Sequence, residues 1–361
     1  MSNSLATKIL QQLCEDNSRN SLVFYRLPYQ KKINYLIGEA RKIGSIGEVL
    51  NETGFAFVPA SNSKGCTPYF IVVASEDVLE HYEKLDLPNI AWAANSKDPA
   101  VTSHSHYLQQ AKSMIDEMKV HKLEKVILSR VKKQETVSFN PWETFKKLCT
   151  KYPSVMVYCV TIPGEGTWLG ATPETLIKVD NGIAQTEALA GTQADNGMPL
   201  EKIEWGTKEQ EEQQIVADNI KGLIGSYFPN ALLETEGPKT VSTGVLLHLI
   251  TRFKWHTQYN NAAIESFIKA LHPTPAIVGQ PREAALKLIS NLETHDRAYY
   301  TGLLGPVNPN KVTHLFVNLR CMQAFDGYVA LYLGGGLTAN SNPDAEWLET
   351  ELKAKTLLSV L

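Results

Sequence analysis

The sequence has no excess of either charge and no long apolar run. Its 361 residues include 35 Lys and Arg against 38 Asp and Glu, a net charge of −3, whereas non-specific nucleic-acid binders need a basic surface to neutralise phosphates. No segment approaches the roughly 18 apolar residues of a membrane-spanning helix, and residues 1–12 do not have the pattern of a secretory signal. We therefore expect a cytoplasmic protein with neither nucleic acid nor membrane as a partner.

Cysteine is scarce, and the common phosphate-binding motifs are missing. An odd number of widely spaced cysteines without a CxxC pair predicts reduced thiols, and excludes a disulfide framework or a zinc site. The chain has no G-x-G-x-x-G after a strand and no G-x-x-x-x-G-K-[ST]. The five cysteines are Cys14, Cys66, Cys149, Cys159 and Cys321.

What is present is the composition of a folded protein, 43% hydrophobic and 20% charged. Turn signals separate the expected elements, and Asp326-Gly327 predicts a tight hairpin. Antiparallel runs of strands with helices between them favour an α+β or mixed-sheet α/β architecture over a doubly wound parallel sheet. We expect strands at 33–36, 54–59, 69–74, 125–130, 155–162, 175–179, 314–325 and 328–333, helices at 108–120 and 207–228 and after residue 342, and a boundary within 95–105.

Paired carboxylates occur at the start of the helix expected at 207–228. Glu209 and Glu212 precede an apolar stripe that includes Val216 and Ile220, so both can extend its inward face. The commoner arrangement is a solvated acidic first turn, which the helix dipole favours.

A second helix, capped by Asn342-Pro343, carries more carboxylates. We expect an apolar stripe that includes Leu348 and Leu352, with Glu346, Glu349 and Lys353 in a stripe beside it. Two such helices could hold a hard cation such as Mg²⁺, which takes oxygen ligands and keeps several waters. The alternative is two acidic faces turned to solvent.

Other polar residues stand in glycine-rich or apolar surroundings. Lys125 lies in an expected strand, where lysines are usually edge residues, and Glu174 lies in a turn. Arg320 is expected within an alternating strand at 315–322, where its planar fork could hold a carboxylate. Gly334-Gly335-Gly336 is expected as a loop where backbone N–H groups meet ligand oxygens, or as a plain turn.

Together these motifs resemble those of the chorismate-utilising enzymes, and most closely the isochorismate synthases. The resemblance is strong from about residue 122 to 361 and weak before that. It rests on segments that agree in order and spacing: 124–130 (EKVILSR), 170–174 (GATPE), 188–192 (ALAGT), the acidic helix from Lys208, 272–276 (HPTPA), Asp296-Arg297, Arg320-Cys321 and 334–353.

The resemblance implies one α/β domain over residues 1–361, with two large mixed β-sheets packed as a sandwich and helices outside. Residues 1–105 would be a variable N-terminal part, and 106–361 the catalytic core. It implies chorismate as substrate and Mg²⁺ as cofactor. By position, Lys125 matches the base that activates the water attacking C2, and Glu174 matches the acid that protonates the departing C4 hydroxyl. Both roles require shifted pKa values.

Further positions are carried over from the family in the same way. Glu212 and Glu349 match metal ligands, with Glu346 and Glu209 as outer-shell partners. The matching substrate contacts are Gly191, Thr192, His248, Ala276, Tyr300, Arg320, Gly334, Gly335 and Lys353.

Within the family, Lys125 argues against the aminating members, which have a small residue there. The expected activity is that of an isochorismate synthase of menaquinone or siderophore biosynthesis. Salicylate synthase, which goes on to eliminate pyruvate, is the alternative, followed by a non-catalytic chorismate-binding protein. We expect a monomer or a weak homodimer. Residues 293–297 (ETHDR) depart from the family pattern, which often has an aromatic or apolar residue before Asp-Arg.

Overall fold

The structure is a computed structural model that describes residues 20–73, 75–79, 98–121, 123–244, 246–257, 261–308 and 312–361. Several sequence predictions fall outside these residues. They are the absence of a signal at 1–12, the state of Cys14, the end of the strand at 69–74, the start of the boundary at 95–105, and residue 122 at the start of the strong resemblance.

Strands form most of the described chain. They are β1 (Asn20–Arg26), β2 (Ile33–Lys42), β3 (Gly54–Val58), β4 (Tyr69–Val72), β5 (Ser75–Leu79), β6 (Lys125–Glu135), β7 (Met156–Ile162), β8 (Gly166–Thr172), β9 (Thr175–Asp180), β10 (Ile183–Ala194), β11 (Glu234–Ser242), β12 (Leu246–His256), β13 (Gly279–Gln280), β14 (Leu303–Val307), β15 (Val312–Val317), β16 (Cys321–Phe325) and β17 (Tyr328–Leu337).

These strands form two sheets that share β2. The first has the order β5-β2-β1-β7-β8-β16-β17-β6-β13. The second has the order β2-β4-β3-β14-β15-β9-β10-β12-β11. Every strand pair in the described part is antiparallel, so the expectation of mixed sheets is wrong in this detail. Tight hairpins explain several of the pairs, since Asn181, Gly182 and Gly327 take the positive φ angles of 48°, 75° and 74° that such turns need.

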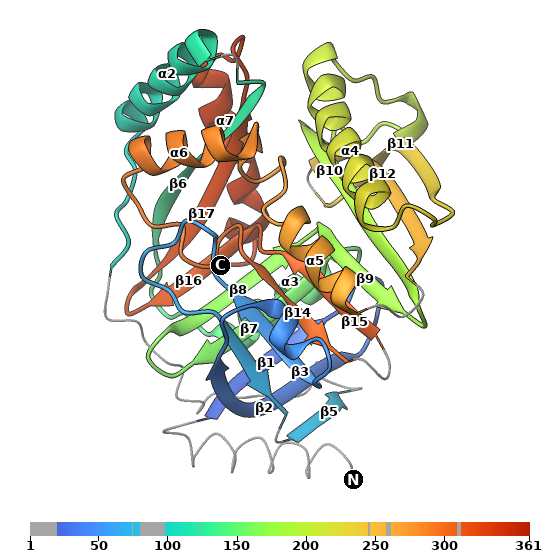
Figure 1. The fold of residues 1–361 in the computed structure, drawn as a ribbon. Coiled ribbons are helices and arrows are strands. Elements are labelled where there is room, and N and C mark those ends of the chain that lie inside the picture. The colour runs from blue at the N-terminus through green and yellow to red at the C-terminus, as the bar shows by residue number, and fades with distance from the viewer. Residues whose placement is uncertain are drawn as a thin grey trace.

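The sheets pack face to face, and helices cover their outer faces, as the sandwich prediction has it. Buried residues of both sheets, including Phe57, Tyr158 and Trp168, form the core between them. The helices are α2 (His104–His121), α3 (Pro141–Lys151), α4 (Thr207–Tyr227), α5 (Asn261–Leu271), α6 (Arg282–Leu292) and α7 (Pro343–Leu358), with 3-10 turns η1 (Ile46–Val49) and η3 (Leu200–Lys202). α3 and α7 pack on the first sheet, α4 and α5 on the second, and α2 and α6 beside β6 and β13 (Figure 1).

The N-terminal part is built into both sheets. β1 pairs with β7 in the first sheet, and β3 pairs with β14 in the second. Among the described residues, no helix is both long and apolar enough to cross a membrane.

The last helix differs from the sequence prediction. Leu348 is 65% exposed, while Glu346, Thr350 and Ala354 lie on the buried face of α7. Of the expected stripe of Ala345, Leu348, Leu352 and Ala354, the position of Ala354 is therefore confirmed and that of Leu348 is wrong. Glu346 can face inward because Lys208 and Ser341 both donate to its Oε1, and a paired carboxylate oxygen can be buried at acceptable cost.

The expected strand at 315–322 is also interrupted. β15 ends at Val317, β16 begins at Cys321, and Arg320 between them has a φ of 46°. In this left-handed conformation Arg320 does not follow the alternating side-chain pattern of a strand, and the turn between β15 and β16 sets the direction of its side chain.

Candidate active site

A cavity of about 80 Å³ lies where the two sheets approach each other, lined by residues from both. β6, β17 and α7 contribute one wall, while β10, β12 and α4 contribute the other (Figure 1). Eleven predicted residues line it: Glu174, Gly191, Thr192, Glu212, His248, Ala276, Tyr300, Arg320, Gly334, Gly335 and Lys353. Seven of the eight segments of the resemblance thus contribute to one place, and Asp296-Arg297 does not. The other predicted site residues, Lys125, Glu209, Glu346 and Glu349, do not line this cavity.

The glycine run at the cavity is a strand, not the expected loop. Gly334, Gly335 and Gly336 pair with Ser129, Leu128 and Ile127 of β6, within β17. β16 pairs with β17 only as far as Tyr332, so the glycine edge of β17 that faces away from β6 has no strand partner in the described part. The Gly334 carbonyl at that edge accepts a hydrogen bond from Lys353 Nζ at 3.0 Å.

The missing side chains of two of these glycines are required. A Cβ on Gly334 would lie 2.7 Å from the Tyr300 hydroxyl oxygen. A Cβ on Gly336 would lie 2.9 Å from Lys125 Cε and 3.0 Å from Glu212 Oε1. Glycine therefore leaves room for these three side chains where they lie, and a larger residue would make them shift.

Lys125 and Glu212 form a buried ion pair. Lys125 is the first residue of β6 and is 1% exposed, and its Nζ lies 2.8 Å from Glu212 Oε1 on α4. Burial alone would raise the pKa of Glu212, but Lys125, Lys353 and Lys208 together lower it below its ordinary value. The helix therefore carries an ionised carboxylate into the site, and the solvated alternative does not apply to Glu212.

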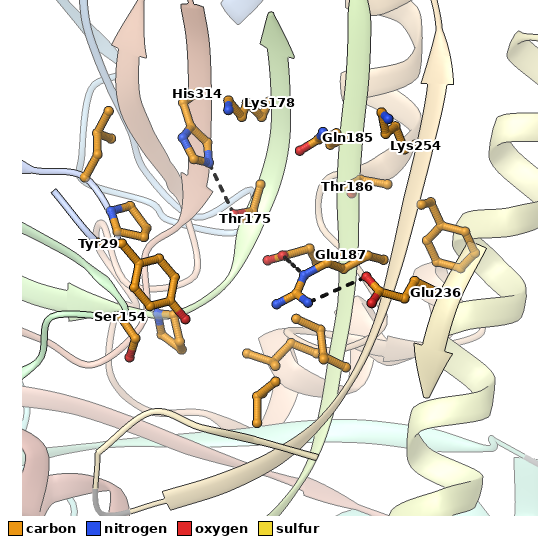
Figure 2. Close-up of a pocket in the computed structure, with 18 of the residues that line it drawn as sticks. Tyr29, Ser154, Thr175, Lys178, Gln185, Thr186, Glu187, Glu236, Lys254 and His314 are labelled. Atoms are coloured by element: carbon orange, nitrogen blue, oxygen red, sulfur yellow. Dashed lines mark hydrogen bonds and ion pairs between the residues drawn. The ribbon is translucent and has the colours of Figure 1, made fainter. Parts of the chain in front are cut away.

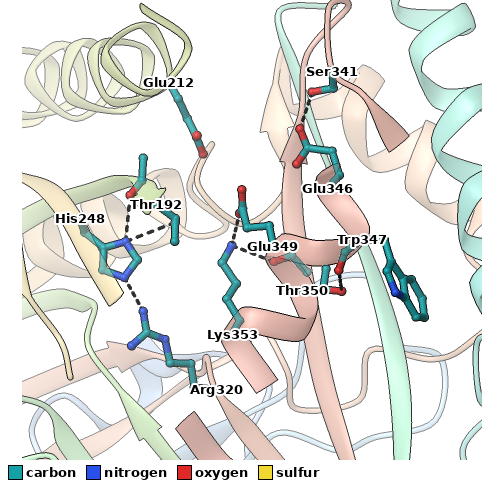
Figure 3. A network of polar contacts seen from close by, with 12 residues as sticks. Thr192, Glu212, His248, Arg320, Ser341, Glu346, Trp347, Glu349, Thr350 and Lys353 are labelled. Atoms are coloured by element: carbon teal, nitrogen blue, oxygen red, sulfur yellow. Dashed lines mark hydrogen bonds and ion pairs between the residues drawn. The ribbon is translucent and has the colours of Figure 1, made fainter. Parts of the chain in front are cut away.

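Two more glutamates, on α7, each contact a lysine (Figure 3). Burial raises the pKa of Glu346 in spite of its lysine partner. Lys353 Nζ lies 2.7 Å from Glu349 Oε1, and Lys208 Nζ lies 2.7 Å from Glu346 Oε1. We call Glu212, Glu346 and Glu349 the three-glutamate cluster. Glu209, one turn earlier on α4, instead points its carboxylate toward Gly206, where a Cβ would lie 2.6 Å from its Oε2.

The cluster has features that suit a cation. Glu346 is 2% exposed, and its Oε2 is buried with no hydrogen-bond partner. This oxygen and Glu349 Oε1 both lie near Gly335, at 3.5 and 3.6 Å from where its Cβ would be. No three acidic, histidine or cysteine side chains in the described residues are close enough to form a complete ligand set. The donor set therefore fits a cation that takes one or two carboxylates and fills its other positions with water or substrate, as Mg²⁺ does.

Glu174 presents the opposite electrostatic situation. It lies in the turn between β8 and β9 and is 3% exposed. Burial raises its pKa to about 8, against the opposing effect of Lys125 and with a further increase from Glu187. Its carboxyl group is therefore largely protonated at neutral pH, the state that a general acid needs.

Arg320 ends a chain of hydrogen bonds across the second sheet (Figure 3). Its Nη1 donates to Thr243 Oγ1 at 2.8 Å, and its Nη2 contacts His248 Nε2. Because a guanidinium can only donate, Nε2 accepts, and His248 Nδ1 carries the proton that it donates to the Gly191 carbonyl at 2.9 Å. Burial lowers the pKa of Arg320 to about 10 and that of His248 well below its ordinary value, so a charged arginine meets a neutral histidine.

Residues 293–297, which depart from the family pattern, contact the backbone that lines the cavity. Arg297 forms a two-pronged ion pair with Glu293, at 2.8 and 2.7 Å, and donates to the backbone carbonyls of Ile127 and Ile277. His295 Nε2 lies 2.9 Å from Ser129 Oγ. These contacts hold backbone that lines the cavity, and none of them reaches the cavity itself.

Among the residues at this site that were not predicted are a glycine, a lysine and a threonine. Gly336 belongs to the glycine run that was noticed, and Lys208 directly precedes Glu209, so both had a signal. Thr243 lies between β11 and β12 with no motif around it, and only the tertiary contact with Arg320 identifies it.

Comparisons with known proteins agree with this geometry. A family model described as chorismate binding enzyme matches residues 72–361. The salicylate biosynthesis isochorismate synthase of Pseudomonas aeruginosa is 30% identical over 243 residues, which cover 66% of this chain and 50% of that protein. Isochorismate synthase EntC of Escherichia coli is 29% identical over 245 residues, covering 66% of this chain and 62% of EntC. The matches thus span about half to three-fifths of these relatives.

Solved structures show the same fold. A putative 2,3-dihydroxybenzoate-specific isochorismate synthase from Bacillus anthracis superposes with a TM-score of 0.79 at 23% identity, covering 98% of this chain and 99% of that one. Anthranilate synthase component I from Streptococcus pneumoniae superposes with a TM-score of 0.70 at 19% identity, covering 94% and 92%. With its motifs gathered in one cavity and the family model matching most of its length, the chain belongs to the family of chorismate-binding enzymes.

Proposed function

We propose that this protein is an isochorismate synthase, an isomerase that adds water at C2 of chorismate and removes the C4 hydroxyl. The observation that carries the proposal is the pair of Lys125 and Glu174 at the cavity: a buried lysine and a buried glutamate that stays protonated at neutral pH. Water addition with loss of a hydroxyl requires one base and one acid, and these two residues supply them.

In this proposal Lys125 takes a proton from the attacking water, and Glu174 gives a proton to the departing hydroxyl. Lys125 must first lose its own proton and its contact with Glu212. Each positioned proton transfer typically contributes about 10²–10⁴-fold to the rate. The small residue of the aminating members at the Lys125 position would leave water without a base, which favours the water-adding class.

We propose Mg²⁺ as the cofactor, held by Glu212 and Glu349, with Glu346 and Glu209 as outer partners. When bound, the ion supplies Lewis-acid stabilisation of a substrate carboxylate. Arg320 and Lys353, with Gly334 and Gly335, would bind the other carboxylate, while Gly191, Thr192, His248, Ala276 and Tyr300 would line the ring. Arg320 is suited to this because five N–H donors form its fork.

The cavity must widen for this substrate to enter. It measures about 80 Å³, whereas small-ligand pockets usually measure about 300–1,000 Å³. Lys353 lines it and Lys125 lies beside it at Gly336, and each reaches a glutamate on a flexible stem. We expect cation and substrate to replace these two ion pairs, which frees the lysines and the space together.

Product analysis tests the proposal. The purified protein is incubated with chorismate and Mg²⁺, with and without EDTA, and the products are separated by chromatography with mass detection. Metal-dependent isochorismate without pyruvate is the expected result. Salicylate with equimolar pyruvate would replace the proposal with a salicylate synthase, and bound chorismate without turnover would replace it with a non-catalytic binding protein.

A further inference from the structure

A second, larger cavity lies directly beside the site. It measures about 980 Å³ and is drawn in Figure 2. Pro173 and Leu189 line both this outer cavity and the active-site cavity. Glu174 lies between Pro173, which both cavities share, and Thr175, which lines the outer one. The candidate acid is therefore part of the wall that separates the two spaces.

The same faces of two strands run from one cavity into the other. Side chains alternate along a strand, so Gln185, Glu187 and Leu189 of β10 share one face, and all three line the outer cavity. On β12, Arg252 lines the outer cavity and His248 the inner one. Glu187 thus lies on the same face of β10 as Leu189, two residues before it, and Leu189 lines both cavities.

Glu187 is fixed in place by its neighbour. It lies directly opposite Arg252 in the β10–β12 register, and Arg252 Nε donates to Glu187 Oε1 at 2.9 Å. The Glu187 side chain is 17% exposed, against 62% for Glu236, which approaches the same arginine only to 3.9 Å (Figure 2). Thr186 Oγ1 donates to the Leu176 carbonyl at 2.6 Å, which ties this part of β10 to the segment that follows Glu174.

We propose that Glu187, held by Arg252, is a positioning residue that acts on Glu174 from the outer cavity and favours its acid form. The inference rests on the proposed function, in which Glu174 gives up a proton in each turnover and must regain one from solvent. A fixed negative charge on the solvent side of Glu174 favours that return. In keeping with this, Glu187 contributes to the raised pKa of Glu174.

The other groups that face Glu174 define what the test must separate. Lys125 on β6 lowers its pKa, and Tyr300, in the segment after α6, interacts with it electrostatically. Glu212, His248 and Arg320 line the same inner cavity. On the outer side, Arg252 offsets part of the charge of Glu187. A change at Glu187 removes a negative charge next to Pro173 and Leu189 without touching the inner groups, and a change at Glu236 removes one from the outer rim.

Glu187→Gln, with Glu236→Gln as the matched control, tests the proposal. Glu174 is titrated in each substrate-free protein by the infrared band of its protonated carboxyl, identified by subtracting the same protein with Glu174→Gln. We expect the wild-type midpoint near pH 8, a midpoint about 0.5–1 unit lower in Glu187→Gln, no shift in Glu236→Gln, and recovery in Glu187→Asp. An unchanged midpoint in Glu187→Gln, or an equal shift in Glu236→Gln, would overturn the proposal.

The pH dependence of kcat/KM gives the functional counterpart. Loss of activity above neutral pH should begin at lower pH in Glu187→Gln, with about a twofold to fivefold deficit near pH 8 and little deficit near pH 6. A merely structural role would lower activity equally at all pH values. The infrared midpoint needs no turnover, so a failure of the isochorismate synthase assignment, seen as no isochorismate from the wild type, remains distinguishable from a failure at Glu187.

Discussion

Two glutamates face Lys125 in this cavity from different elements, and their protonation differs. Glu212 on α4 contacts the ammonium directly at 2.8 Å, and its pKa is lowered. Glu174, in the turn before β9, senses the same lysine without an ion pair, and burial raises its pKa to about 8. Burial alone does not explain this difference, because both carboxyl groups are buried. Direct contact with Lys125 offsets the cost of desolvating the charge of Glu212, whereas the effect of Lys125 on Glu174 does not overcome burial.

The largest expected effect comes from removing the shared cation. Lys125→Ala should lower isochorismate formation by about 10²–10⁴-fold, because the attacking water loses its base. Chorismate binding, followed by calorimetry, should largely persist. Lys254→Ala, a lysine on β12 that is 42% exposed, is the control. Near-wild-type turnover in a folded Lys125→Ala protein would contradict the role of Lys125 as the base.

Removing a carboxylate of the proposed metal site should raise the concentration of Mg²⁺ that activity requires. Glu212→Gln or Glu349→Gln should raise the Mg²⁺ concentration for half-maximal activity at least about tenfold, since Mg²⁺ relies on one or two charged carboxylates. Glu211→Gln changes an exposed neighbour on the same helix and should have no effect. Unchanged Mg²⁺ titrations in both variants would place the metal elsewhere.

A substitution of Arg320 tests its proposed role in binding a carboxylate of the substrate. Arg320→Ala should raise the KM for chorismate by about 10- to 100-fold, the value of charged hydrogen bonds worth about 1.5–3 kcal/mol. Arg320→Lys should recover only part of this, because an ammonium lacks the planar fork. Steady-state kinetics would give the answer, and a KM equal to wild type would exclude Arg320 from the carboxylate site.

A stability measurement sharpens the comparison without substrate. An unfolded glutamate releases its proton near pH 4.5, whereas folded Glu174 keeps its own until about pH 8. Unfolding therefore releases a proton within this window, so this contribution to stability is present below pH 4.5 and is lost as pH rises to 8. Glu174→Gln should remove that loss. Its unfolding temperature should rise relative to wild type between pH 5 and 8, as scanning calorimetry can measure; a constant difference would mean that Glu174 is ionised.

Much of the fold follows from local pattern. The strands near 54–59, 155–162 and 175–179 and the helix at 207–228 were predicted within a few residues, because their apolar periodicity and turn residues act locally. The errors fall where tertiary contacts oppose that pattern. Leu348 is exposed and Glu346 buried on α7, because Lys208 and Ser341 partner the carboxylate.

The candidate site was predicted as a set of residue types, carried by the resemblance of separated motifs. Which of them meet was not in the sequence. Their spacing on one helix made Glu209 and Glu212 equivalent, and only the resemblance gave them different roles; in the structure Glu212 is the one that reaches Lys125. Arg320 was expected in a strand, and it is the turn at φ 46° that sends its guanidinium to Thr243 and His248.

The sequence by itself determined the family, the types of side chain at the site and most of the secondary structure, since these depend on residue identity and short-range spacing. The tertiary structure decided which carboxyl groups are ionised and which is protonated. It also placed Glu187 and a second cavity behind Glu174. A pKa depends on burial and on charges within a few ångströms, and here those charges come from strands and helices far apart in the chain.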